Sequence, residues 1–309
     1  MKQSDKRTEY ILPEDQFNLA EIFSILLAEK LIIGITTLAA ALLSIVISIS
    51  LPNMYTATAL LAPTDQSESG MSGLMKQYGG IASMAGISLP QGQGGRSKLA
   101  LEMMKSRKFL TNFVERREIL PELMASKSWD SGSGKINYDR SIFDSKMKKW
   151  NDSKPSKQKA YREINQIISI YEDPLTFFVS ISIEHKSPII AANWVNWLVE
   201  DVNNALREQD VLEATQSIEY LKQQIASTPL SELQSMFSQL IQKQTETIML
   251  AEVRPEYVFK TIDPAIVPEQ KSKPSRSLIV ILSTLLGAII SILFVLARHF
   301  TDPKAGDHS

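Results

Sequence analysis

The sequence predicts an α+β fold in which two transmembrane helices flank an α/β base domain that carries a long projecting helix. Two uncharged, proline-free apolar runs cover residues 31–51 and 277–297. Each is about 20 residues long, which matches the roughly 30 Å hydrocarbon core of a bilayer at 1.5 Å per helical residue. Residues 52–276 between them are largely polar and hold both strand and helix patterns. These observations predict a two-span membrane protein with one large domain outside the cytoplasm.

Basic residues predict the orientation of the first span. Lys2, Lys6, Arg7 and Lys30 precede it, and the next basic residue is Lys76. The positive-inside rule therefore places residues 1–30 in the cytoplasm, and an even number of spans returns the tail, residues 298–309, to the same side. Lys271, Lys273 and Arg276 lie on the outer side of the second span, where the rule does not favour them. Because the first helix usually dominates, both termini are expected in the cytoplasm.

A secretory signal peptide is the alternative for the first run. Such a peptide has a shorter apolar region behind a short basic start. Here about 30 polar residues come first, and the run ends in Leu51-Pro52-Asn53-Met54, so an anchor is favoured.

Composition excludes several classes of function. The net charge is −1, with 22% charged residues, so no strong field points to nucleic acid. The chain has no cysteine, which excludes thiol nucleophiles, iron–sulfur clusters and zinc–thiolate sites. No cofactor and no metal site is expected.

The first half of the chain alternates between ordered patterns and a glycine-rich segment. Asn18 to Glu21 has the form of a capping box and predicts a helix that leads into the first span. Residues 54–61 predict an edge or central strand that Pro63 stops. Eight of the 13 glycines lie between Gly70 and Gly95, so residues 64–98 predict a flexible or oligomer-dependent segment. One helix is predicted over 97–114, and loops with short helices over 126–160.

The second half carries the clearest patterns. Residues 174–184 alternate as a strand does. Ser187 and Pro188 then open a long helix, about 188–228, in which apolar residues recur every three or four positions. Pro229 interrupts it, a second helix is predicted over about 231–252, and a last strand over 257–262. A proline-marked stretch leads from there into the second span.

No catalytic constellation stands out. The domain has a single histidine, His185, which is expected to be structural. Ser145 with Lys148 and Ser156 with Lys159 match the S-x-x-K pattern, but they lie in a Ser/Lys-rich stretch without the partner motifs of such enzymes. Gly287 and Ser291 form a small-x-x-x-small pattern in the second span, which lets helices approach closely. Gly34 and residues 39–41 offer a similar surface on the first span.

Together these parts resemble the chain-length determinant proteins, the Wzz-type polysaccharide co-polymerases of the bacterial inner membrane. The resemblance covers nearly the whole chain. It lies in residues 17–30, in residues 55–57 and in residues 184–196 at the start of the long helix. The most specific part is the membrane-proximal motif Asp263, Pro264 and Ala265, followed by Pro268 and Pro274 before the second span.

The resemblance implies a regulator, not an enzyme, whose main domain is periplasmic. Members form ring-like homo-oligomers and act with a separate membrane polymerase to set the length of a lipid-linked polysaccharide, most often lipopolysaccharide O-antigen. The expected partners are other copies of the chain, that polymerase, the lipid bilayer and, as a candidate, lipid-linked polysaccharide; no nucleic acid is expected. Ala191, Val195, Leu198 and Val202 would support helix packing or subunit contact, and Gly287 and Ser291 the contact between spans. Because the sequence ends eleven residues past Arg298, it resembles the kinase-free type.

Two alternatives remain open from the sequence. A structural adaptor for capsule or exopolysaccharide export would have the same architecture, and the length of the glycine-rich segment leaves the class of polymer open. A two-span sensor is disfavoured because the tail is too short for an output domain.

Overall fold

The computed structural model describes residues 23, 26–64, 95–227 and 229–301 of the chain. The chain divides into two compact units, Met1–Leu51 with Pro274–Ser309, and Pro52–Lys273. The capping box at Asn18 and nearly all of the glycine-rich segment lie outside the described residues.

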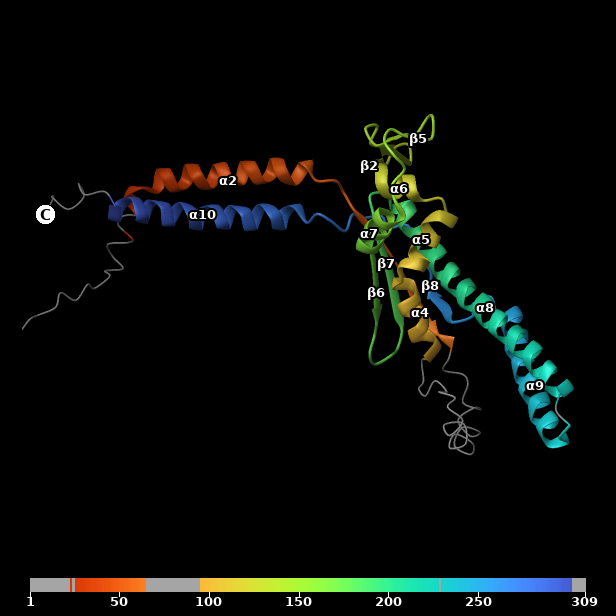
Figure 1. Cartoon of the computed structure of the whole chain (residues 1–309). Coiled ribbons are helices and arrows are strands. Elements are labelled where there is room, and N and C mark those ends of the chain that lie inside the picture. The colour runs from red at the N-terminus through yellow and green to blue at the C-terminus, as the bar shows by residue number, and fades with distance from the viewer. Residues whose placement is uncertain (1–22, 24–25, 65–94, 228, 302–309) are drawn as a thin grey trace, which may run out of the picture. The chain divides into compact units, whose positions relative to one another are not determined.

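The first unit holds the two apolar helices, α2 (Lys30–Ser50) and α10 (Arg276–Thr301), which lie side by side in Figure 1. Both are long and apolar enough to cross a membrane, with mean hydropathies of 2.5 and 2.9. The helices cover the predicted spans 31–51 and 277–297, except that α2 ends at Ser50, one residue early.

The second unit is built on a four-stranded antiparallel sheet in the order β6-β7-β1-β8. The strands are β1 (Tyr55–Pro63), β6 (Ile168–Glu172), β7 (Val179–His185) and β8 (Phe259–Asp263). Strand β1 lies in the centre, so of the two predicted positions the central one is correct. Every second residue of β7 is buried, as its alternating sequence predicts.

Helix α8 (Pro188–Ser227) packs on this sheet, and α9 (Ser231–Val253) folds back along it. Figure 1 shows the two helices as a hairpin that extends beyond the sheet. Their bounds lie close to the predicted ranges 188–228 and 231–252. Ser187 caps α8 through its hydroxyl, which accepts from the N–H of Ile190 at 3.5 Å, and Pro188 occupies the first helical position.

Four shorter helices complete the core: α4 (Gly95–Lys105), α5 (Arg107–Arg116), α6 (Leu120–Ala125) and α7 (Lys157–Ile167). The single helix predicted over 97–114 is wrong, because the chain breaks at Ser106. The backbone of Ser106 is extended, and its hydroxyl accepts from the N–H of Phe109 at 3.2 Å, which starts a new helix.

Residues 126–160 also differ from the prediction of loops with short helices. They form two small antiparallel hairpins, β2 (Ser126–Asp130) with β3 (Lys135–Tyr138) and β4 (Phe143–Asp144) with β5 (Lys149–Trp150), before α7 begins. Tilted aromatic contacts stabilise them: Phe143 lies 5.7 Å from Tyr138 and 4.9 Å from Trp150, measured between ring centroids.

The strand predicted over 174–184 begins later, at Val179. Residues before it form a turn in which the Asp173 carboxylate accepts from the N–H groups of Leu175 and Thr176, at 2.8 and 3.1 Å. This turn joins β7 to β6, a strand that the sequence analysis did not predict. The predicted last strand, 257–262, is β8, shifted to begin at Phe259.

Candidate functional site

Two asparagines of α8 hold the segment that runs back toward the second span. The amide of Asn196 bonds both main-chain groups of Ala265, each at 3.0 Å. The amide of Asn203 donates to the carbonyl of Phe259 at 3.0 Å and accepts from the N–H groups of Val258 and Phe259 at 2.9 Å. Seven residues are two helical turns, so both amides lie on one face of α8. Each amide satisfies main-chain groups as a neighbouring strand would.

This arrangement gives the membrane-proximal motif a physical role at one residue. Ala265 is buried and held by Asn196, while Asp263 and Pro264 are exposed and Pro268 and Pro274 are half-buried. The roles of Asn196 and Asn203 were not predicted from the sequence. The available signal was two asparagines, seven positions apart, on the apolar face of a helix, where a polar side chain needs a partner.

The two connections to the apolar helices leave the domain at one point. The N–H of Met54 donates to the carbonyl of Lys273 at 3.0 Å, and the N–H of Ser272 donates back to the carbonyl of Met54 at 2.8 Å. Beside this bridge, the ammonium group of Lys273 pairs with Glu184 at 2.7 Å. The start of β1 and the end of the proline-marked stretch are therefore fixed to each other.

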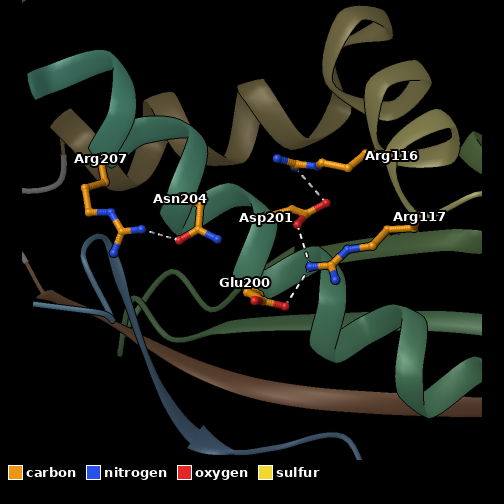
Figure 2. Close-up of polar contacts among 6 residues, drawn as sticks. All are labelled: Arg116, Arg117, Glu200, Asp201, Asn204 and Arg207. Atoms are coloured by element: carbon orange, nitrogen blue, oxygen red, sulfur yellow. Dashed lines mark hydrogen bonds and ion pairs between the residues drawn. The ribbon is translucent and has the colours of Figure 1, made fainter. Parts of the chain in front are cut away.

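A charged cluster joins α5 to α8 (Figure 2). The carboxylate of Asp201 pairs with Arg116 at 2.8 Å and with Arg117 at 2.7 Å, and Arg117 also pairs with Glu200 at 2.6 Å. The Asp201 side chain is only 2% exposed, whereas that of Glu200 is 57% exposed. Two arginines around one buried carboxylate are what a stable buried charge requires. The guanidinium of Arg117 also lies 5.3 Å from the ring centroid of Trp197.

A second polar cluster joins α4, α8 and the entry to β8. The hydroxyl of Tyr257 donates to the carboxylate of Asp210 at 2.7 Å, and Arg96 pairs with the same oxygen at 3.2 Å. Arg96 also lies 5.7 Å from the Tyr257 ring centroid. Together with the asparagine pair, these clusters join α8 to α4, to the end of α5 and to the residues at and around β8.

His185 has the structural role that the sequence predicts. Its Nδ1 accepts from the N–H of Ser187 at 3.0 Å, so the proton of the neutral ring lies on Nε2, 3.3 Å from the carbonyl of Glu122. The ring packs on Trp194 at 5.0 Å. Burial lowers the pKa of His185 to about 4, so it is neutral at physiological pH.

The other candidates for chemistry also have structural environments. Ser156 is the N-cap of α7, and its hydroxyl accepts from the N–H of Lys159 at 3.3 Å, which occupies the oxygen of that S-x-x-K match. Ser145 lies exposed in the β4–β5 turn. Within the part of the chain that the structure describes, no group of three or more His, Asp or Glu side chains could hold a metal ion.

The four long-helix positions named from the sequence lie inside the core of the domain. Ala191, Val195, Leu198 and Val202 are each 0% exposed and pack against the sheet and the short helices. Gly287 and Ser291 lie where α10 meets α2: a Cβ at Gly287 would be 2.6 Å from that of Ala40, and the hydroxyl of Ser291 is 2.6 Å from that of Thr36. Gly34, in contrast, has open space around it.

Comparison with known proteins assigns both ends of the chain. Residues 15–116 match the family "Chain length determinant protein", and residues 232–300 match the family "G-rich domain on putative tyrosine kinase". The first match covers about a third of the 309 residues and the second less than a quarter. Comparison of the sequence with curated proteins gives no match.

Two solved structures resemble the chain at low identity. A full-length bacterial polysaccharide co-polymerase is 14% identical, with a TM-score of 0.40 and coverage of 94% of this chain and 100% of its own. A fragment of WzzB, the polysaccharide co-polymerase from Salmonella Typhimurium, is 13% identical, with a TM-score of 0.29 and coverage of 72% and 100%. The sequence matches therefore carry the comparison: residues 15–116, which include the first candidate membrane helix, are similar to the chain length determinant family.

Proposed function

We propose that this protein sets the modal length of a surface polysaccharide, with lipopolysaccharide O-antigen as the first candidate polymer. The match of residues 15–116 to the chain length determinant family carries this proposal. The structure supports a mechanical role, because the conspicuous polar contacts of the domain, at Asn196, Asn203 and Asp201, join its own elements. The protein would therefore act by shape and contact, without catalysis, on a separate membrane polymerase.

Several copies of the chain would form the active assembly. Ala191, Val195, Leu198 and Val202 have no exposed surface to offer a second copy, so we assign them to packing within one chain. Contacts between copies would then use other surfaces. The exposed face of α9, with Met236 at 58% and Leu240 at 45% exposure, has the apolar character that such contacts need.

The large domain would lie in the periplasm and both termini in the cytoplasm. Because the chain has no cysteine, this topology can be tested with single introduced thiols. In intact cells, a membrane-impermeant maleimide should label Ser145→Cys in the β4–β5 turn, and should label Ser309→Cys only after the inner membrane is opened. Labelling of both thiols in intact spheroplasts would contradict the topology.

The experiment that tests the function is an electrophoretic ladder of lipopolysaccharide from cells with and without the protein. Without it, the cluster of long chains should change to a smooth decay of lengths, and expression from a plasmid should restore the cluster. If the ladder stays the same while another polysaccharide disappears from the surface, the export-adaptor function is correct and length control of O-antigen is wrong.

A further inference from the structure

The two small hairpins carry a net positive charge in a chain that is slightly acidic. Residues 126–154, here the hairpin lobe, hold seven basic and four acidic residues, a net charge of +3 in a chain whose total is −1. The basic residues are Lys127, Lys135, Arg140, Lys146, Lys148, Lys149 and Lys154. All seven are exposed.

The charge of Lys127 acts on the carboxylate of Asp139, but the basic side chains of the lobe form no ion pair within the described residues. Among the described residues, none of the seven has a carboxylate within 4.0 Å. Three of the four carboxylates of the lobe bind their own turns: Asp130 accepts from Ser133 at 2.7 Å, Asp139 from Ser141 at 2.7 Å, and Asp144 from the N–H of Lys146 at 2.9 Å. The lysines therefore remain available to an external anion.

Apolar side chains lie among the lysines. Met147, between Lys146 and Lys148 at the β4–β5 turn, is 76% exposed, and Ile142 is 39% exposed. Trp129 is half-buried. Long basic side chains beside exposed apolar and aromatic groups are typical of surfaces that lie at the membrane–water interface.

One residue of the hairpin lobe contacts a residue that follows the first span closely in the sequence. The ring of Trp129 packs edge-on against that of Tyr55, with centroids 5.6 Å apart. Tyr55 follows Leu51 by four residues, and four extended residues reach about 14 Å at most. The bridge between Met54 and Lys273 places the connection to the second span at the same point. Electrostatic attraction to a charged surface acts over about 8–10 Å at physiological salt, a distance comparable to this tether.

We propose that the hairpin lobe binds the anionic phospholipid headgroups of the leaflet into which the two spans emerge. Lys146, Lys148 and Lys149 contact the phosphates, and Met147 enters the interface. This binding fixes the tilt of the domain on the membrane, in addition to the two covalent connections. The proposal rests on the spans crossing a bilayer, and it is independent of the polymer whose length is controlled.

A pair of matched thiol variants tests the proposal in the full-length protein. Ser145→Cys carries an environment-sensitive fluorophore beside the three lysines, and Ser235→Cys carries it on the exposed side of α9. Each protein is reconstituted in bilayers of phosphatidylcholine alone or mixed with phosphatidylglycerol. The emission at residue 145 should shift to the blue only with phosphatidylglycerol, high salt should reverse the shift, and the emission at residue 235 should not change.

Charge removal gives the quantitative test. In the Ser145→Cys protein, K146Q/K148Q/K149Q should lower the ratio of bound to free lobe about fivefold per lysine. Three exposed lysines outside the lobe, changed as K98Q/K222Q/K260Q, should leave the ratio unchanged. Equal effects of the two triple variants, or no shift with phosphatidylglycerol, would overturn the proposal. A shift produced by inorganic pyrophosphate in phosphatidylcholine alone would also overturn it, in favour of a site for the phosphates of a lipid carrier.

Discussion

Glu118 occupies a backbone position where helices usually place glycine. Its φ is 54°, in the left-handed region, and it follows the last turn of α5. The N–H of Ile119 donates to the carbonyl of Val114, and that of Glu118 to the carbonyl of Glu115, both at 3.2 Å, which is the Schellman pattern. The buried side chains of Ile119 and Val114 complete it. This cap orients the end of α5, from which Arg116 and Arg117 reach Asp201.

We expect Glu118→Gly to stabilise the protein. Glycine adopts positive φ without steric cost, so the free energy of unfolding should rise by about 0.5–1 kcal/mol. The side chain of Glu118 is exposed, so little contact is lost. Denaturant unfolding of the purified full-length protein measures the change, and Glu118→Ala serves as the control that keeps the strain. Equal stabilities for the glycine and alanine variants would show that the cap carries no strain.

His185 should make the domain less stable in acid. Its pKa is about 4 in the folded protein and 6.5 when exposed, so between these values the unfolded chain binds more protons. The stability is complete above pH 6.5 and falls as the pH drops toward 4, by roughly 3 kcal/mol. The measurement is the free energy of unfolding at several pH values, compared with His185→Gln, which cannot titrate. If both proteins lose stability equally over this range, the buried histidine is not the cause.

At the scale of the elements, the side chain of Asn203 forms hydrogen bonds with the main chain at the start of β8, as a neighbouring strand would. Asn203→Ala should leave three buried main-chain groups without partners, which costs about 3 kcal/mol. Among the described residues, the side chain of the neighbouring Asn204 bonds Arg207 alone, at 2.9 Å (Figure 2), so Asn204→Ala should cost less than about 1 kcal/mol. Thermal unfolding of the two variants measures the difference. Similar losses at the two positions would mean that the asparagine does not hold the strand.

Helices and strands were predicted correctly from the sequence where residues close together in the chain determine them. The helix α8 and the interruption at Pro229 are set by residues close in sequence, and the structure places both near the expected positions. The break at Ser106 depends on one hydrogen bond, in which the Ser106 hydroxyl accepts from the N–H of Phe109. The amino-acid composition of the segment does not predict that bond. The hairpins after Ser126 are short, and their stability comes from tilted aromatic contacts among Tyr138, Phe143 and Trp150, so no strand pattern was visible.

The candidate site was less predictable than the fold for the same reason. The family resemblance pointed to the motif around Ala265. The side chain that binds Ala265, that of Asn196, lies 69 residues earlier in the chain. Asn196 and Ala265 come together only in the folded domain, where α8 packs across the sheet. Similarly, Gly287 was predicted as a packing position, but the sequence did not determine whether Gly34 or Ala40 of the first span would contact it.

At the scale of the whole molecule, we propose that a polymerase in the membrane meets the two spans, so the contact between α2 and α10 should matter for length control. A side chain at Gly287 would place a Cβ 2.6 Å from that of Ala40, and the spans would have to separate. We therefore expect Gly287→Val to lose the modal cluster in the lipopolysaccharide ladder. Gly34→Val, with nothing within 4 Å of its Cβ position, should keep the cluster.

The effect of the same two variants on the contact between the spans can be measured by cross-linking in the membrane. The hydroxyls of Thr36 and Ser291 are 2.6 Å apart, so the double variant Thr36→Cys/Ser291→Cys should form a disulfide on mild oxidation. In that background Gly287→Val should slow the cross-link severalfold, whereas Gly34→Val should not. If Gly287→Val slows the cross-link and the modal cluster survives, the spans are an anchor only, and length control resides in the large domain. If both are lost together, close packing of the spans is part of the mechanism, because the substitution leaves the domain at residues 52–273 untouched.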